Sequence, residues 1–266
     1  MKAHILTDNR AAAPGIVGEH GLSVFIEHKK MNILFDTGQS GIYCINAGHM
    51  GVELDRVDCV VLSHGHYDHC GGLTHFPTRD ESPKVYVHKD AFRKKYALNS
   101  DGETYREIGI PWVLDDLGGI EDDVVFTGGH TSLAPGIDLI AEVPYVTSFE
   151  KVNPHLYVGD ASHKSPDPMN DEQMLVIDGD EGLSVFLGCS HPGIINCLHH
   201  ILRMFPGKHV DTLVAGMHLE NAEPERVNVT IRQMLDLNIR RVIPLHCTGI
   251  VAITEIRSDL RYCYDH

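Results

Sequence analysis

The sequence predicts an α/β fold built as a four-layer sandwich, with two sheets inside and helices outside. Apolar strand-like runs recur along the chain, helix-like segments lie between them, and the second half repeats this texture. The chain has 266 residues, of which 42% are hydrophobic and 22% charged. This length and composition suit one large domain with a sizeable core, and we expect a single domain over residues 1–266.

The first half predicts four strands and three helices. The strands are expected at residues 22–26, 32–35, 57–62 and 84–88, and the helices at 40–50, about 68–76 and 89–96. In the second half we expect a hairpin of strands 174–177 and 183–187, strands 212–215 and 241–243, and helices 194–204, 224–237 and 254–260. Residues 98–119 and 155–171 are polar or rich in Pro and Asp, which fits either functional lids or surface insertions.

Composition limits the classes of function. The formal net charge of −15 opposes non-specific binding to nucleic acid and to anionic membranes, although bound divalent ions would still allow an anionic substrate. No apolar stretch approaches the ~18 residues of a membrane span, and the amino terminus turns polar too soon for a signal peptide. Seven cysteines without a CxxC pair suit reduced thiols. We therefore expect a cytoplasmic protein with neither nucleic acid nor membrane as a partner.

The segment from His64 to His69 is the most informative feature of the chain. His64, His66, Asp68 and His69 place three imidazoles and a carboxylate in six positions, directly after the apolar run 59–62. Such ligands at the carboxyl end of a buried strand indicate a metal site rather than a core. His64 and His66 can hold one ion, and Asp68 and His69 a second ion about 3.5–4 Å away. A His-rich surface loop is the alternative, because the chain has 19 histidines.

This HxHxDH pattern resembles the signature of the metallo-β-lactamase fold superfamily. The resemblance implies an αββα sandwich and gives roles to three more residues at strand ends. Asp36 would brace the His-rich loop, although an Asp before Thr-Gly is also an ordinary turn residue. His191 would complete the site of His64 and His66, and His246 the site of Asp68 and His69. Cys189 and Cys247 adjoin these histidines, and we favour buried neighbours over ligands for both.

One position departs from the superfamily pattern. Most members with two metals have a bridging Asp between the residues that correspond to His191 and His246, but here the strand in that interval ends in Gly-Met-His218-Leu. Asp211 lies at the other end of that strand, and Asp160 precedes His191. We expect His218 either to take the place of the carboxylate, to act as an acid in the pocket, or to be a supporting histidine.

The motifs GCSHPG, AGMHL and PLHCTG narrow the resemblance. They are similar to those of a subgroup of metal-dependent hydrolases that includes the archaeal dihydropterin (ribofuranosylaminobenzene phosphate) synthase. The resemblance implies two divalent ions, with Zn favoured and Fe or Mn also suited, and a metal-bound hydroxide that attacks a small phosphate-containing or ester substrate. Asp68 and His218 are the candidate catalytic residues. A synthase-like transferase and a non-catalytic ligand sensor are the alternatives, and the oligomeric state is left open.

Overall fold

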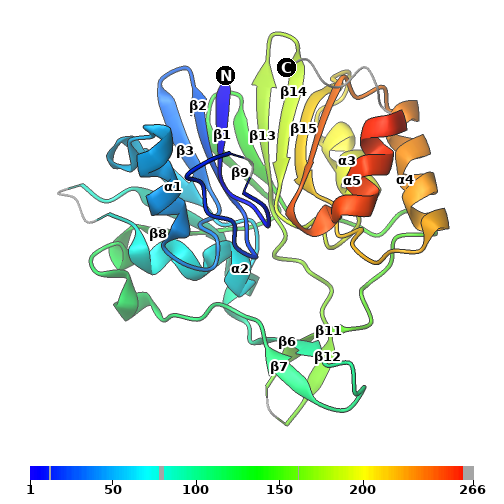
Figure 1. Ribbon diagram of the computed structural model, residues 1–266, viewed down its shortest axis with the longest axis horizontal. Coiled ribbons are helices and arrows are strands. Elements are labelled where there is room, and N and C mark those ends of the chain that lie inside the picture. Colours follow the sequence, from blue (N-terminus) through cyan, green and yellow to red (C-terminus); the bar gives the residue numbers. More distant parts are fainter. Residues whose placement is uncertain (12, 78–80, 161, 260–266) are drawn as a thin grey trace. The chain divides into compact units, whose positions relative to one another are not determined.

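The computed structural model describes residues 1–11, 13–77, 81–160 and 162–259, and the backbone forms two compact units (Figure 1). The first unit comprises Met1–Thr127 and Asn153–Asp167, and the second comprises Gly128–Val152 and Pro168–His266. Each unit contains a six-stranded sheet and helices, which confirms the predicted α/β class. That both units belong to a single domain stays a prediction.

The main sheet of the first unit has the strand order β1-β2-β3-β4-β5-β8. Its strands are β1 (Lys2–Thr7), β2 (Ser23–His28), β3 (Met31–Phe35), β4 (Cys59–Val61), β5 (Lys84–His88) and β8 (Val124–Thr127). The pairs β1–β2 and β2–β3 are antiparallel, and the strands from β3 to β8 pair in parallel. The parallel strand β4 is buried along its whole length, as its continuous apolar sequence predicts.

Helix α1 (Ile42–Met50) packs against β1 in the first unit. Its buried Tyr43 and Ala47 share one apolar cluster with Leu34 of β3 and Val60 of β4. The remaining helical turns of this unit are short: η1 (Leu54–Arg56), α2 (Tyr67–Cys70), η2 (Gly71–His75), η3 (Lys89–Phe92), η4 (Leu114–Leu117) and η5 (Glu121–Asp123).

Two helices expected in the first unit are shorter than the sequence predicts. The helix expected over 68–76 is the four-residue α2 followed by the 3₁₀ turn η2, because Gly71 and Gly72 are poor residues for continuing an α-helix. The helix expected over 89–96 is also wrong, since η3 ends at Phe92 and the chain then enters strand β6. Pairing with distant strands overrides the local preference there.

A small antiparallel sheet completes the first unit, in the order β12-β11-β6-β7. Its strands are β6 (Lys95–Leu98), β7 (Tyr105–Glu107), β11 (Leu156–Gly159) and β12 (Lys164–Pro166). Three of them, β7, β11 and β12, come from the segments 98–119 and 155–171, in which the sequence analysis expected no strand. A buried ion pair between Lys95 Nζ and Asp167 Oδ2, at 2.7 Å, ties β6 to the residue that follows β12.

The second unit has its own sheet, in the order β16-β15-β14-β13-β10-β9. Its strands are β9 (His130–Ala134), β10 (Ile137–Ile140), β13 (Met174–Gly179), β14 (Gly182–Leu187), β15 (Val210–Gly216) and β16 (Arg241–Leu245). Strands β13 and β14 form the predicted hairpin, with Leu175 opposite Phe186. Strands β14, β15 and β16 pair in parallel, so their carboxyl ends meet at one edge.

Helices α3 (Ile194–Met204), α4 (Pro224–Asp236) and α5 (Ile250–Asp259) accompany this sheet, beside β15 in Figure 1. Leu198 and Ile231 bury their side chains in one cluster with Leu213 and Val242 of the sheet. Helix α3 has the predicted bounds, whereas α5 begins earlier than expected, and Leu260 lies outside the described residues. Within the described residues, no helix has the length and apolar composition that a membrane crossing requires.

Candidate metal centre

The predicted metal loop lies just after the buried strand β4. Its four candidate ligands are buried, with His64 and His69 fully so and His66 and Asp68 less than a tenth exposed. Gly65 separates the first two histidines, and a Cβ there would stand 2.2 Å from the Ala91 carbonyl oxygen. Only glycine therefore lets the loop pack this closely on η3.

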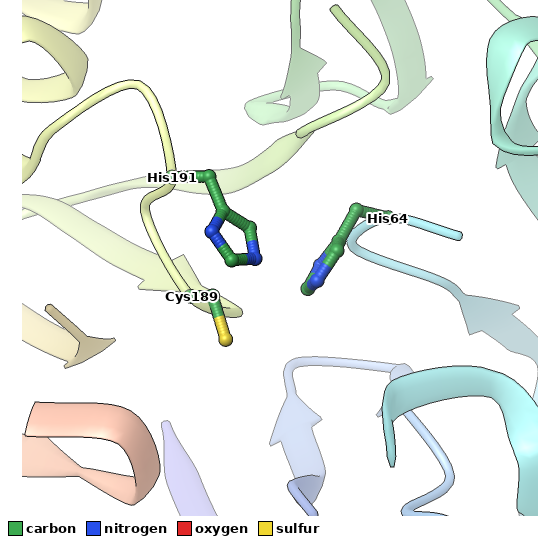
Figure 2. A group of neighbouring side chains, drawn as sticks. All are labelled: His64, Cys189 and His191. Carbon is green, nitrogen blue, oxygen red and sulfur yellow. The ribbon is translucent and has the colours of Figure 1, made fainter. Parts of the chain in front are cut away.

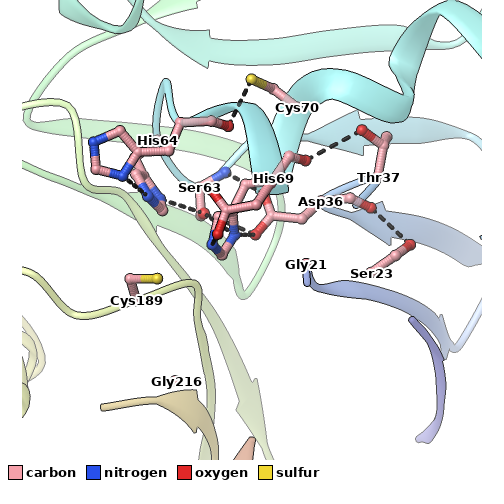
Figure 3. Close-up of polar contacts among 12 residues, drawn as sticks. Gly21, Ser23, Asp36, Thr37, Ser63, His64, His69, Cys70, Cys189 and Gly216 are labelled. Carbon is pink, nitrogen blue, oxygen red and sulfur yellow. Dashed lines mark hydrogen bonds and ion pairs between the residues drawn. The ribbon is translucent and has the colours of Figure 1, made fainter. Parts of the chain in front are cut away.

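Asp36 holds this loop from behind. It is fully buried at the end of β3, and its Oδ1 accepts a hydrogen bond from the Ser63 amide at 2.6 Å (Figure 3). Its Oδ2 accepts two more, from the Ser63 hydroxyl and from His69 Nδ1, each at 2.7 Å. The structure thus brings Asp36 to the loop that the family resemblance predicts it to brace.

This network determines which ring nitrogens carry protons. Ser63 gives its hydroxyl proton to Asp36, so it accepts a hydrogen bond from His64 Nδ1 at 2.9 Å. His69 Nδ1 likewise donates to Asp36. Both histidines then turn an unprotonated Nε2 away from the carboxylate, which is the form that binds metals. The same loop residues therefore position the histidines and select their tautomers.

The donor atoms of the loop face one another. His64 Nε2 lies 3.0 Å from His66 Nδ1, and His69 Nε2 lies 3.7 Å from Asp68 Oδ2. Two ring nitrogens at this separation can share one cation, and imidazole with carboxylate suits Zn, Fe or Mn. The chemistry of this donor set therefore fits the divalent ions that the sequence predicts.

His20 is a residue that the sequence interpretation missed. Its Nε2 lies 3.2 Å from Asp68 Oδ2, on a half-exposed side chain. The backbone brings it there, because the Leu22 amide donates to the Asp68 carbonyl at 3.2 Å. No ligand spacing marks His20, and only its place just before a predicted strand could have drawn attention to it.

In the second unit, His191 lies on the loop between β14 and α3. Fully buried Glu172 holds this loop through its backbone. Glu172 Oε1 accepts hydrogen bonds from the amides of Cys189 and Ser190 at 3.1 and 3.0 Å, and Oε2 accepts one from the His191 amide at 3.3 Å. Sequence reasoning missed this role, because Glu172 lies between the segment 155–171 and the strand expected at 174–177, and no ligand spacing marks it.

Cys189 and two histidines come together within the second unit. Figure 2 draws Cys189 and His191 on the loop after β14, and His246 follows β16. Cys189 Sγ lies within 4.8 Å of a ring nitrogen of His191 and of a ring nitrogen of His246. Cys189 is buried, as we expected of a neighbour, but its sulfur also has the position of a donor.

Cys247 and His218 lie close to this group. The Cys247 sulfur accepts a hydrogen bond from the His218 amide at 3.3 Å. The His218 ring is exposed, and its centroid lies 4.7 Å from that of His191. Cys247 therefore supports the backbone of His218, and His218 can exchange protons with solvent beside His191.

Two carboxylates could be considered for the place of the missing bridging Asp, and Asp211 does not reach the carboxyl end of β15. Asp211 lies at the start of that strand, where its Oδ2 pairs with Arg241 at 2.7 Å and its Oδ1 with Arg240 at 3.3 Å. Asp160 belongs to the first unit and accepts hydrogen bonds from Ser162 and the His163 amide in the turn after β11. Each carboxylate is thus engaged by partners within its own unit.

The sequence model of the Metallo-beta-lactamase superfamily matches residues 16–218. The chain belongs to the metallo-β-lactamase superfamily. The match covers the bracing aspartate, the HxHxDH loop and the His191 loop, and it extends to His218. It confirms the family that the motifs indicate.

Two relatives, both from Methanocaldococcus jannaschii, match most of this chain. Uncharacterized protein MJ0448 is 30% identical over 263 residues, which cover 98% of this chain and 96% of the relative. The 7,8-dihydropterin-6-methyl-4-(beta-D-ribofuranosyl)-aminobenzene-5'-phosphate synthase is 29% identical over 264 residues, which cover 91% and 85%. The second match confirms the predicted resemblance to this synthase.

A crystal structure also resembles the protein along nearly its whole length. Tm1679, described as a metal-dependent hydrolase of the beta-lactamase superfamily, has a TM-score of 0.81 and 29% sequence identity. The similarity covers 98% of this chain and 92% of that chain. The α/β metallo-β-lactamase fold class is thereby confirmed.

Proposed function

We propose that this protein is a metal-dependent hydrolase of a small molecule with a phosphate or ester group. The observation that carries the proposal is the hydrogen-bond network from Asp36 through Ser63 to His64 and His69. It holds both rings in the tautomer whose Nε2 is unprotonated and can bind a metal.

The proposed ligands are those of the sequence prediction. His64, His66 and His191 would hold one ion, and Asp68, His69 and His246 would hold the other. Cys189, for which the sequence favoured a buried neighbour, would be a further soft donor. Zn is favoured, and Fe or Mn is also suited. The ions would supply Lewis acidity and lower the pKa of a water molecule towards neutrality.

The other steps fall to side chains of this chain. Asp68 accepts a hydrogen bond from the attacking water and orients it. His218, whose exposed ring can be recharged from solvent, protonates the leaving group or hydrogen-bonds to the developing negative charge. Asp36 and Ser63 do not touch the substrate and act only by positioning His64 and His69.

The experiment compares His66→Ala with His49→Ala. His49 lies exposed on α1, so its loss controls for the removal of one histidine from the first unit. We expect His66→Ala to keep its circular dichroism spectrum, to lose bound metal by elemental analysis, and to lose metal-dependent hydrolysis of p-nitrophenyl phosphate and of aryl esters. Full activity of His66→Ala in the absence of metal would overturn the mechanism.

The second candidate function is a synthase reaction. The 29% identity to the dihydropterin synthase over 91% of this chain favours it. The same metal site would then serve to activate a diphosphate leaving group. Incubation with a dihydropterin diphosphate and a ribofuranosylaminobenzene phosphate tests this, since the synthase releases pyrophosphate and forms a coupled product visible by mass spectrometry.

The third alternative is a non-catalytic ligand sensor in the cytoplasm. Elemental analysis of the purified protein separates it from both enzymes. Protein that is purified without metal and that turns over no substrate after metal is added would favour the sensor.

A further inference from the structure

A cavity of about 1020 Å³ opens in the first unit beside the metal loop. Three aromatic side chains line it, Tyr67, Phe92 and Trp112, together with three cationic ones, Arg93, Lys94 and Arg106. Nothing in the hydrolase chemistry above uses these residues. We call these six side chains the wall of the cavity, and their composition requires an explanation of its own.

The cavity is connected directly to the metal loop. Tyr67 stands between His66 and Asp68 in the sequence, and its amide donates to the Ile108 carbonyl at 3.0 Å. Trp112 Nε1 donates to the Cys70 carbonyl at 2.7 Å, at the end of α2. A ligand held against this wall would thus lie next to the segment that carries His66 and Asp68.

The aromatic side of the wall can hold a flat group. The rings of Phe92 and Trp112 lie with centroids 5.9 Å apart at an angle of 77°. Trp112 is almost fully buried and fixed by its hydrogen bond, while Phe92 is half-buried. A rigid aromatic surface of this kind stacks planar ligands at little cost in side-chain entropy.

The cationic side is unusual for this chain, in which 37 acidic residues outnumber 22 Lys and Arg. Two carboxylates also line the cavity, but Asp116 accepts a hydrogen bond from the Val113 amide at 2.9 Å and is engaged there. Asp116 keeps its negative charge in that bond, so the three cations of the lining stand against two carboxylates, Glu107 and Asp116. A local excess of positive charge in an acidic protein favours an anionic ligand.

Arg106 extends this charge towards the metal loop. Arg106 lines the cavity together with Tyr67. Arg106 therefore acts next to the residue that adjoins both His66 and Asp68, and its planar guanidinium can bind an oxyanion with two hydrogen bonds.

We infer that this cavity binds the substrate by packing a flat aromatic or heteroaromatic group face-on to one ring of the perpendicular pair Phe92 and Trp112 and edge-on to the other. A phosphate or carboxylate of the same ligand pairs with Arg93, Lys94 and Arg106. That the bound molecule is a substrate rests on the proposed function, whereas its binding in the cavity requires no turnover. The cavity thus narrows the substrate class to planar aromatic anions.

Trp112 is the single tryptophan of the chain, so its fluorescence reports on this cavity alone. The test titrates the purified protein with benzylphosphonate, whose C–P bond a phosphoester hydrolase does not cleave. Benzyl alcohol and methylphosphonate supply the ring and the anion separately, and phenylacetate replaces phosphonate with carboxylate. We expect benzylphosphonate or phenylacetate to change Trp112 emission and to bind at least about tenfold more tightly than either fragment.

The matched variants are Arg106→Gln and Arg56→Gln. Arg56 is exposed in the same unit and does not line this cavity. We expect Arg106→Gln to bind the anionic probe about tenfold more weakly than the parent and to bind benzyl alcohol as the parent does. Arg56→Gln should bind both probes as the parent does. Equal affinity in Arg106→Gln and the parent, or no gain over the fragments, would overturn the inference.

The outcome for the cavity is separable from that for the hydrolase. Tight, Arg106-dependent binding without hydrolysis of any ester under metal loading supports the cavity and contradicts the proposed function. Metal-dependent hydrolysis that Arg106→Gln leaves intact in both kcat and KM for an aromatic phosphate contradicts the cavity alone.

Discussion

The Glu172 carboxylate accepts a 3.3 Å hydrogen bond from the backbone amide of His191 and holds the two preceding amides with its other oxygen. In the first unit, Asp36 holds the Ser63 amide and the His69 ring in a comparable way. Each unit therefore has one fully buried carboxylate that shapes a loop of candidate ligands. Glu172 acts on backbone, whereas Asp36 also acts on a ring proton, and the two should respond differently to substitution.

Replacement of Glu172 by Ala should destabilise the second unit. It leaves three buried amides without their acceptor, and each such loss costs about 1–3 kcal/mol. We expect the free energy of unfolding in urea to fall by about 3 kcal/mol or more, with Glu172→Gln intermediate because its carbonyl can still accept. Glu181→Ala is the control, since Glu181 is an exposed residue paired with Arg240. A loss no larger than in this control would contradict the role of Glu172.

Replacement of Asp36 by Asn should weaken metal binding more than folding. The Asn side chain can accept only with its single oxygen. Either the Ser63 amide or the His69 ring therefore loses its acceptor. Loss of a group that orients a ligating His typically costs 10–100-fold in metal affinity, that is, about 1.4–2.8 kcal/mol. Competition with a chromogenic chelator measures this directly.

The Ser63→Ala variant refines the same prediction. It removes the hydroxyl that lies between Asp36 and His64 Nδ1 but keeps the His69 contact. We expect a weaker loss of metal affinity than in Asp36→Asn. If Asp36→Asn binds metal as tightly as the parent protein, the tautomer argument fails.

These loops also show how far the sequence leads. The HxHxDH spacing marked four donor residues directly after a strand, and the family resemblance added Asp36, His191 and His246 at the ends of other strands. The structure has these residues at strand ends, and their roles as metal ligands stay predictions. The roles of Glu172 and His20 could not be predicted. Glu172 acts through hydrogen bonds to backbone amides and His20 through a contact with Asp68, and neither kind of contact leaves a spacing pattern in the sequence. The helix expected at 89–96 failed for a related reason. Lys95 is buried by its ion pair with Asp167, a partner far along the chain that no local pattern reveals.

Cys189 should be visible in the spectrum of a cobalt-substituted protein. Its sulfur lies within 4.8 Å of ring nitrogens of His191 and His246, so a bound ion would meet a thiolate donor. We expect a near-ultraviolet thiolate-to-cobalt absorption band that Cys189→Ser lacks. Cys247→Ser is the matched control and should keep the band, because the Cys247 sulfur serves the His218 amide. An unchanged band in Cys189→Ser would assign Cys189 the role of a buried neighbour.

Asp211 should give the protein a pH-dependent stability on the acid side. Burial acts to raise the pKa of this carboxyl, but the hydrogen bond from Arg241 and then that from Thr212 outweigh it, so the pKa is lowered from 3.8. A carboxyl with a lowered folded pKa adds stability above its unfolded pKa and loses it as the pH falls through the folded value. We therefore expect Asp211→Asn to reduce the free energy of unfolding at pH 7 by about 1–2 kcal/mol.

The difference between the parent and Asp211→Asn should shrink as the pH falls below about 4, because the parent then also carries a neutral side chain. Urea denaturation at a series of pH values measures it. Asp138→Asn is a suitable control in the same sheet, since Asp138 on β10 pairs with the half-exposed His130 and, among the residues that the structure describes, with no arginine. A difference between the parent and Asp211→Asn that stays constant from pH 7 to pH 3 would show that the Arg241 pair carries no proton linkage and that the substitution acts through packing alone.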